Sequence, residues 1–398
     1  MSGAPDAGKA REVFAVFLKL GLSSFGGPIA HLGYFRAEFV ERRRWVSEQA
    51  FVDLVALSQF LPGPASSQTG FAIGLMRAGY RGGASAWLGF TLPSAILLIL
   101  FAWGAGSLAD TAWGAGVLHG LKLVAVAIVA QAVMGMARTL CPDRTRASIA
   151  VVAIFAFLAL SGSLGQVVAI LIGGAAGFFL CRGAADAHAS ALTIPVSRRA
   201  ALASLALFFL LLGLAFVPAG RTPLGLFDAF YRSGALVFGG GDVVLPLLRD
   251  AVVAPGWISD GAFLAGYGAA QAVPGPLFTF AAYLGAAASV PPGGVAGALI
   301  ALVAIFLPGA LILMGTLPFW QALRARSKAQ AAMQGVSAAV VGLLAAALYN
   351  PVWTSAVATP LDFAIASAAF VMLIAWRSPP LLVVVACALA GVATVLIK

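Results

Sequence analysis

Residues 17–28 read Phe-Leu-Lys-Leu-Gly-Leu-Ser-Ser-Phe-Gly-Gly-Pro, and residues 230–241 read Phe-Tyr-Arg-Ser-Gly-Ala-Leu-Val-Phe-Gly-Gly-Gly. Further matches follow these two stretches in the same order, each pair 211–215 positions apart: Trp45 and Trp257, Gln59 and Gln271 with the Pro-Gly-Pro three residues later, Gly82 and Gly293, and Leu92 and Leu307. Chance does not supply five matches in one order. The chain is therefore interpreted as two homologous halves.

The composition is that of a membrane protein. Of 398 residues, 61% are hydrophobic and 10% charged, and the mean hydropathy is +1.00. Soluble domains have roughly 45–50% apolar and roughly 25% charged residues. This excludes an ordinary globular enzyme, a disordered chain and a nucleic-acid binder with a solvated surface. At roughly 20 residues per span, the length holds about 10–13 membrane segments, so we expect an all-α polytopic membrane protein.

Charge and cysteines point to no cofactor. The net charge is +10, and the basic residues sit in short loops between apolar runs, where they orient a membrane protein. Cys141, Cys181 and Cys387 are scattered, without metal-ligand or disulfide spacing. We therefore expect no metal, no cofactor and no nucleic-acid partner. Residues 1–12 are polar and lack the pattern of a cleaved signal peptide.

The repeats predict a division of the chain into four parts. Residues 1–12 form a cytoplasmic tail, 13–190 the first transporter repeat, 191–199 a cytoplasmic linker, and 200–398 the second repeat. Internal repeats that meet at a site near the bilayer midplane are typical of secondary transporters. The oligomeric state stays open, with a homodimer as one option.

Basic residues predict that the two repeats are inverted. Loop 36–48 carries four arginines, whereas its counterpart 249–262 carries only Arg249. Loop 77–83 has two arginines and 286–294 has none. The bias reverses in the third pair, because 106–116 has no basic residue and 321–330 has three. Basic loops face the cytoplasm, so equivalent loops are expected on opposite sides of the membrane.

The same rule predicts broken hairpins. Loops 36–48 and 77–83 are both basic, so segment 51–75 between them enters the membrane and returns, with Pro62-Gly63-Pro64 at its tip. Segment 13–36 behaves likewise around residues 25–28, and 227–248 and 263–285 are the equivalents in the second repeat. The N-terminus is then cytoplasmic. The alternative is that all four segments cross fully, which places Arg42–Arg44 outside.

The glycine- and proline-rich tips predict an anion site. Non-helical backbone inside a membrane is tolerated only within protein or against a watery cavity. Pro28, Pro64 and Pro276 are expected to mark helix starts, each of which carries about half a positive charge and free N–H groups. Four such starts at the repeat interface would total roughly +2, which matches a tetrahedral dianion. The hydroxyl groups near the tips are concentrated in the first half.

Several polar side chains near the tips have two interpretations. Lys19 and Arg232 are equivalent cations within apolar runs, and they either serve the substrate or reach the membrane surface. Gln59 and Gln271 either bind ligand or cap backbone. Asp242 either caps a helix or couples a proton. The full set of candidate substrate-binding residues is Lys19, Ser23, Ser24, Gly26, Gly27, Pro28, Gln59, Pro62, Gly63, Pro64, Ser66, Ser67, Arg232, Gly239, Gly240, Asp242, Gln271, Pro274, Gly275 and Pro276.

Three residues outside this set are harder to interpret. His31 and His119 are expected to be packing or interface residues rather than ligands. Lys122 lies one turn after His119 in a third apolar segment, and its counterpart in the second repeat is Ser337. It either adds charge to the cavity or sits at the end of its helix.

These motifs resemble those of the chromate ion transporter family. The resemblance rests on Phe25-Gly-Gly-Pro28, Pro62-Gly63-Pro64 and their counterparts at 238–241 and 274–276, and it covers nearly the whole chain, as in long two-domain members. It implies export of chromate across the bacterial inner membrane, and thereby chromate resistance. Gly241 and Asp242 stand where the first half has Pro28 and its successor, which argues against a strictly symmetric site.

Two other functions are weighed against chromate export. A transporter or exchanger of sulfate or a related oxyanion would use the same kind of site. A membrane enzyme acting on lipid phosphates would need clustered carboxylates for Mg²⁺ or a phosphatase set of His and Arg, and the sequence has few acidic residues in its apolar segments. The energy source is expected to be the membrane potential or the proton motive force, because no nucleotide-binding P-loop sequence is present.

Overall fold

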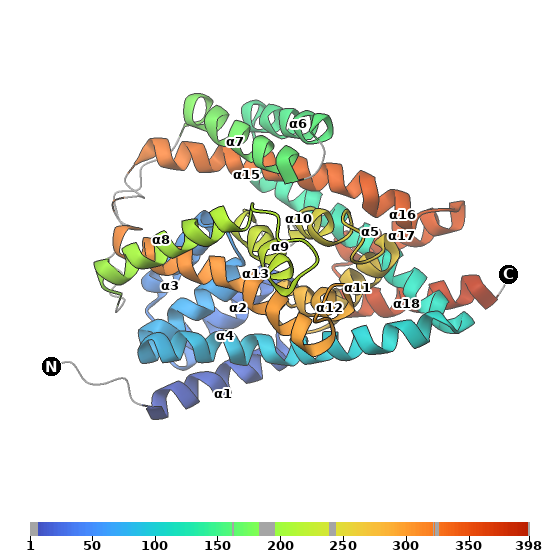
Figure 1. The fold of residues 1–398 in the computed structure, drawn as a ribbon, viewed down its shortest axis with the longest axis horizontal. Helices are drawn as coiled ribbons and strands as arrows, with labels where there is room; N and C mark the ends of the chain where they lie inside the picture. Colours follow the sequence, from blue (N-terminus) through green and yellow to red (C-terminus); the bar gives the residue numbers. More distant parts are fainter. Residues whose placement is uncertain are drawn as a thin grey trace.

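The computed structural model describes residues 7–160, 163–182, 196–238, 244–320, 322 and 326–396. These residues form helices and no strand, so the prediction of an all-α polytopic membrane protein is confirmed. The longest helices run along the long axis of the molecule, and the shorter helices α9–α12 lie between them (Figure 1).

The helices of the first half are α1 (Ala7–Ser23), α2 (Gly27–Phe35), the π-helical η1 (Arg36–Arg42), α3 (Glu48–Phe60), α4 (Ala65–Ala109), α5 (Ala112–Leu140), α6 (Arg144–Ala159) and α7 (Ser163–Leu180). Those of the second half are α8 (Arg198–Leu214), α9 (Pro223–Ala235), α10 (Val244–Val252), α11 (Asp260–Ala272), η3 (Leu277–Thr279), α12 (Phe280–Ala287), α13 (Gly294–Thr316), η4 (Leu317–Phe319), α15 (Ser327–Ala347), η5 (Leu348–Trp353), α16 (Thr354–Ala356), α17 (Pro360–Ile374) and α18 (Pro380–Leu396).

The arms on either side of the predicted tips are too short to cross a bilayer. Helices α3, α9 and α11 have 13 residues each, and α2 and α10 have nine. At 1.5 Å per residue, 13 residues extend about 20 Å, whereas the hydrocarbon core is about 30 Å thick. The helices are therefore broken where the sequence predicts the tips.

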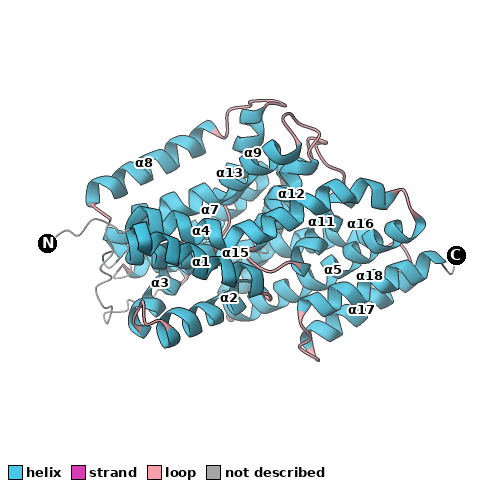
Figure 2. Ribbon diagram, turned by 90° about the horizontal axis from the view of Figure 1, so that it is seen from below, coloured by secondary structure: helices cyan, strands magenta, loops and turns pink. Residues whose placement is uncertain are grey.

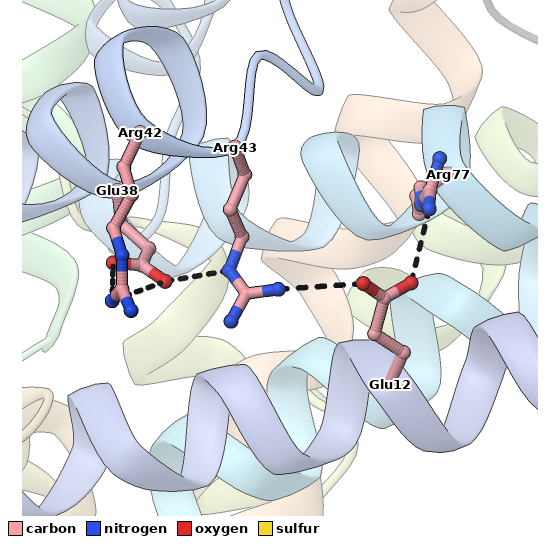
Figure 3. Close-up of polar contacts among 5 residues, drawn as sticks. All are labelled: Glu12, Glu38, Arg42, Arg43 and Arg77. Carbon is pink, nitrogen blue, oxygen red and sulfur yellow. Dashed lines mark hydrogen bonds and ion pairs between the residues drawn. The ribbon is translucent and has the colours of Figure 1, made fainter.

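In the first half, both hairpins return to the end from which they start (Figure 3). Glu12 at the start of α1 pairs with Arg43, just after η1, at 3.3 Å and with Arg77 of α4 at 3.0 Å. The side chain of Trp45 lies under both guanidinium groups. A segment that returns to its starting end does not cross, so these contacts favour hairpins over the alternative of four full crossings.

The second half joins the open ends of its hairpins with one ion pair, Arg249 with Asp260 at 2.9 Å, and with hydrogen bonds. Arg221, just before α9, donates to the carbonyl oxygen of Ser289, just after α12, over 3.0 Å. Ser289 in turn donates through its N–H to the carbonyl oxygen of Trp257, which lies between the two hairpins, over 3.0 Å. Trp45 and Trp257 therefore occupy equivalent places at the open ends of the paired hairpins.

Four helical stretches among the described residues are long and apolar enough to span a membrane by themselves: 65–105, 112–140, 294–319 and 327–356. Helices α6, α8 and α17 also follow predicted spans, but with 15–17 residues they extend only about 22–26 Å. Helices α8 and α15 begin, and α13 ends, at the same end of the molecule as the N-terminus (Figures 1 and 2). The basic segments next to these helix ends therefore share one face.

In each half, one long helix packs against the last two helices of the other half. Helix α5 lies against α17 and α18, and α15 lies against α6 and α7. Glycines make both contacts close: a Cβ added at Gly120 would lie 2.1 Å from the carbonyl oxygen of Cys387, and one added at Gly335 would lie 2.0 Å from that of Gly173. Small residues are typical of close helix packing in membranes.

The two segments expected as loops are more helical than the sequence suggests. Within 77–83 the chain turns sharply at Ala78 and Gly79, where Gly79 has φ +61°, so the break expected there lies between two helical parts of α4. The helix resumes at once because Gly82 packs directly on the backbone of Gly74, which holds the two parts together. Residues 36–42 form η1 rather than an extended loop.

Candidate functional site

The tips of the four hairpins form two contacts between the halves. The N–H of Gly275 donates to the carbonyl oxygen of Ser24 over 2.9 Å, and the N–H of Gly63 donates to that of Val237 over 2.7 Å. We call these contacts the 24–275 crossing and the 63–237 crossing. Each joins the Pro-Gly-Pro tip of one half to the residue before Phe-Gly-Gly in the other half.

The backbone at both Pro-Gly-Pro tips requires glycine. Gly63 has φ +119° and Gly275 has φ +99°, values that side-chain-bearing residues rarely adopt. Space is also short. A Cβ at Gly63 would lie 3.1 Å from the Cα of Gly309, and one at Gly275 would lie 2.9 Å from the Oγ of Ser94. The tips can therefore approach the partner half only because both residues lack a side chain.

Three helices start at the tips, close to where the prolines predict. Helix α2 begins at Gly27 with Pro28 in its first turn, and α4 begins at Ala65, directly after Pro64. Pro276 is followed first by the 3₁₀ turn η3, so α12 begins only at Phe280. The first-turn N–H groups of α2 and α4 have no acceptor within their own helices, which suits them to bind an anion.

The 24–275 crossing is polar and buried. His31 is 1% exposed, its Nε2 donates to the carbonyl oxygen of Ser24 over 3.2 Å, and its Nδ1 lies 3.3 Å from the Oγ of Ser66. Because a carbonyl oxygen only accepts, Nε2 carries the proton and Nδ1 of the neutral ring accepts from Ser66. His31 therefore joins the starts of α2 and α4 within the first half.

The segments near this crossing carry three buried hydrogen-bond donors without a partner among the described residues. The buried atoms Ser24 Oγ, Thr91 Oγ1 and Gln271 Nε2 have no hydrogen-bond partner among the described residues. A buried polar group without a partner is costly and calls for an explanation, such as a ligand. Two hydroxyl groups and an amide NH₂ are neutral donors, which is the chemistry that an oxyanion needs.

The 63–237 crossing borders a pocket of about 190 Å³. The first turns of α4 form one wall, residues 84–87 of the same helix a second, and α13 a third. The lining residues are Pro64, Ser67, Gln68, Phe71, Ala84, Trp87, Val303, Phe306, Leu307, Gly309 and Ala310. Three of them have buried polar atoms without a partner among the described residues: Ser67 Oγ, Gln68 Oε1 and Trp87 Nε1.

The polar groups belong mainly to the first half, as the sequence indicates. Its buried polar residues near the tips are Ser24, His31, Ser58, Ser66, Ser67, Gln68, Thr69, Thr91 and Ser94. In the second half, Val237, Phe278 and Ala281 are buried at the equivalent places, and Thr279 is bonded to the carbonyl oxygen of Pro276. The two crossings are thus alike in backbone and different in side chains.

The other candidate residues lie farther from the crossings or are not described. Lys19, Ser23 and Gln59 have exposed side chains, and the Oγ of Ser23 is bonded to the carbonyl oxygen of Lys19 in its own helix. The guanidinium of Arg232 donates to the carbonyl oxygen of Ala215 over 2.8 Å and lies over the ring of Phe216. The last three candidates lie outside the described residues: Gly239, Gly240 and Asp242.

Lys122 and His119 contact the second half. A Cβ added at Gly261 of α11 would lie 2.9 Å from the Nζ of Lys122. His119 Nε2 lies 2.7 Å from the carboxylate of Asp362 on α17. His119 therefore has the interface role expected for it, whereas the role of Lys122 stays open.

The structure adds three residues that the motifs did not select. Gln68 follows Ser67 in the first turn of α4, and its position next to the Pro-Gly-Pro tip could have suggested a role. Trp87 lies within the apolar run of α4 between the repeat matches at Gly82 and Leu92, and Thr91 directly precedes Leu92, but neither residue is itself part of a match. They reach the site only because α4 folds back over the tips.

An all-helical polytopic membrane protein whose broken helices meet in its interior belongs, by fold and site, to the class of membrane transporters. The model of the chromate transporter family matches residues 11–178 and 224–392, so the chain belongs to that family.

Relatives with assigned names agree with this membership. The chromate transport protein of Pseudomonas aeruginosa is 32% identical over 393 residues, which cover 96% of this chain and 91% of that protein. The probable chromate transport protein of Synechococcus elongatus is 29% identical over 85% of this chain and 83% of its own length. The chromate transport protein of Cupriavidus metallidurans is 25% identical over 85% of this chain and 81% of its own length. No solved structure matches the chain.

Proposed function

We propose that this protein exports chromate from the bacterial cytoplasm and thereby confers chromate resistance. The observation that carries the proposal is the pair of tip crossings, formed by segments that carry helix starts, a buried histidine, and buried hydroxyl and amide groups without a partner among the described residues. Membership in the chromate transporter family supplies the substrate.

The substrate contacts are assigned to the tips. The candidates closest to the crossings are Ser24, Gly26, Gly27, Pro28, Pro62, Gly63, Pro64, Ser66, Ser67, Gln271, Pro274, Gly275 and Pro276, to which we add Gln68, Trp87 and Thr91. Neutral donors and helix starts bind an oxyanion without holding it by a salt bridge. Such a site suits transport, because the substrate must leave as readily as it enters.

Export is favoured by the membrane potential. Moving one charge across 100 mV is worth about 2.3 kcal/mol, so a dianion leaving a cell that is negative inside gains about 4.6 kcal/mol. This corresponds to more than three decades of concentration ratio. The potential therefore suffices as the energy source, and the proton motive force is the second source that we consider.

The proposed orientation places the N-terminus in the cytoplasm and the protein in the inner membrane. The ion pairs of Glu12 with Arg43 and Arg77 bring the basic segments of the first half to one end, and the starts of α8 and α15 lie at that end (Figures 1 and 3). Basic ends face the cytoplasm. We also propose that the two halves insert in opposite orientations.

Sulfate or a related tetrahedral oxyanion is the second candidate substrate. The donors at the 24–275 crossing are neutral, so they accept any oxyanion of suitable size. The two candidates are separated by competition, in which sulfate is added to vesicles that carry labelled chromate.

The test is a flux measurement with the purified full-length protein in proteoliposomes. Labelled chromate should leave vesicles faster when the interior is made negative, and slower when it is made positive. The matched control is the same protein with Gly275→Val, which blocks the tip contact but leaves the spanning helices. Flux that is equal in protein-free and protein-containing vesicles would exclude the proposed function.

A further inference from the structure

We propose that a groove between α6 and α7 binds an anionic phospholipid, with an acyl chain along the groove and the phosphate at its basic end. The groove shares no lining residue with the pocket beside the 63–237 crossing. The inference therefore goes beyond the proposed function and does not rest on it.

The groove opens on the face of the protein that contacts lipid. Helices α6 and α7 lie side by side at one edge of the molecule, packed on α15 (Figure 1). The groove between them has a volume of about 380 Å³. Three of its apolar lining residues are well exposed, Val152 at 48%, Ile172 at 38% and Leu180 at 64%. Its remaining lining residues are Thr145, Ser148, Ile149 and Ala176.

One end of the groove is polar and the other is apolar. Helix α6 ends at Ala159 and α7 begins at Ser163, and so short a connection makes neighbouring helices antiparallel. The start of α6 therefore lies beside the end of α7. Thr145 and Ser148 bring hydroxyl groups to this end, whereas the lining farther along α6 and α7 is aliphatic. A phospholipid has the same sequence of a polar head and apolar chains.

Basic side chains gather at the polar end. Arg144 and Arg182 adjoin the lining residues of this end in the sequence, and both are exposed. Lys328 of α15 donates from its Nζ to the carbonyl oxygen of Phe178, in the last turn of α7, over 3.2 Å and lies 5.0 Å from the centre of that ring. Since Lys328 belongs to the second half, both halves contribute charge to this end.

This basic charge is largely uncompensated. Among the described residues of 138–148, 178–182 and 326–330, Asp143 is the only acidic one, and it pairs with Arg146 at 2.6 Å. Arg144, Arg182 and Lys328 form no ion pair with the residues that the structure describes, so they are available to an anion. Guanidinium groups bind phosphate with two hydrogen bonds, and basic clusters at the ends of membrane helices attract anionic head groups. A soluble anion would leave the apolar part of the groove unused, whereas a lipid fills both parts.

The test titrates the purified, delipidated full-length protein with phosphatidylglycerol and with phosphatidylethanolamine of the same acyl chains, and native mass spectrometry counts the bound lipid. Phosphatidylglycerol should bind about tenfold more tightly, because the ammonium group of phosphatidylethanolamine cancels the charge of its phosphate. Equal affinities for the two lipids overturn the inference. So does glycerol phosphate that competes as well as phosphatidylglycerol, because it has a phosphate and no acyl chain.

Variants at the basic end test the role of the charge. Arg144→Gln combined with Arg182→Gln should lower the affinity for phosphatidylglycerol roughly 10- to 30-fold, because each basic group near a head group contributes roughly a factor of five. Arg198→Gln combined with Arg199→Gln is the matched control, since it removes the same charge from exposed positions at the start of α8, outside the groove. Equal losses in the two double variants overturn the assignment to this groove.

Variants on α7 test the role of the groove itself. Ala176→Phe places a ring among the lining residues and should abolish the tight binding of phosphatidylglycerol. Ala175→Phe adds the same ring at the neighbouring exposed position, which does not line the groove, and should leave binding unchanged. Equal binding by the two variants overturns the inference. If Ala176→Phe does not fold, the comparison of the two arginine pairs still decides.

Discussion

The N–H of Gly63 donates to the carbonyl oxygen of Val237 over 2.7 Å, and the equivalent glycine of the other half, Gly275, makes the reciprocal bond to Ser24 over 2.9 Å. Each half therefore completes the broken tip of the other. This is what two structurally similar halves produce when they face each other across a shared interior. A change at one crossing should thus have a counterpart of similar size at the other.

The first prediction concerns these glycines. Gly63→Ala and Gly275→Ala should each lower the stability of the protein by roughly 1–3 kcal/mol, because the backbone has positive φ and the added Cβ meets close neighbours. Transport should fall with both changes. Thermal unfolding in detergent and chromate flux in vesicles measure the two effects.

The matched control is Gly213→Ala in helix α8. A Cβ at Gly213 meets no atom within 4 Å, and alanine has a higher helix propensity than glycine. This variant should be at least as stable as the unaltered protein. If Gly63→Ala behaves like Gly213→Ala in both measurements, the crossing does not have the role that we give it.

A second prediction concerns topology. Single cysteines in place of Arg42 and Arg81 should react with an impermeant thiol reagent from the same side of the membrane, because Glu12 binds both Arg43 and Arg77. A cysteine in place of Trp113, at the start of α5, should react from the opposite side. The background for these variants lacks the three native cysteines. Reaction of the cysteines at 42 and 81 from opposite sides would contradict the hairpins.

The sequence predicts well where the hairpins break, but it predicts poorly which helices pack against each other. The Pro-Gly-Pro and Phe-Gly-Gly motifs locate the breaks because glycine and proline act on the local backbone. Nothing comparable predicts that α5 packs on α18 or that α15 packs on α7. Those contacts depend on single glycines such as Gly120 and Gly335 within apolar helices, where small residues are common for many reasons.

The residues of the candidate site likewise divide into those that a local motif predicts and those that only the fold brings to the site. Ser24, Ser66 and Gly275 lie near their motifs and meet in the structure. Trp87 has no local signal, since it reaches the pocket only because α4 runs back past the tip of its own hairpin. The sequence makes Lys19 a candidate for binding the substrate, because it is a cation in an apolar run, but its side chain is exposed.

A third prediction is a pH dependence of stability outside the membrane segments. Burial alone raises the pKa of Glu38, but hydrogen bonds from Arg43 and Arg42 outweigh it and hold the pKa below the ordinary value of 4.5. The unfolded chain therefore binds this proton more readily than the folded protein. The stabilisation is complete above pH 4.5 and is lost as the pH falls through the lower pKa of the folded state.

Thermal unfolding of Glu38→Gln checks this dependence. The variant should unfold at a lower temperature than the unaltered protein at neutral pH, and the difference should shrink in acid. Glu41→Gln is the control, because Glu41 is 56% exposed and its pair with Arg36 is screened by water. A difference that is the same at every pH would show that the charge of Glu38 does not matter.

The last prediction separates the two equivalent cations. Arg232→Ala should lower both stability and transport, because the guanidinium bonds the carbonyl oxygen of Ala215, near the end of α8, and a lost bond of this kind costs roughly 1.5–3 kcal/mol. Lys19→Ala should lower transport without lowering stability, because the Lys19 side chain is exposed and forms no hydrogen bond or ion pair with the residues that the structure describes. Chromate resistance of cells and thermal unfolding of the purified variants provide the two measurements. Lys19→Arg, which keeps the charge, should restore resistance. Normal resistance in a protein that carries both alanine substitutions would show that neither cation guides the anion, and the neutral groups at the crossings would then have to act alone.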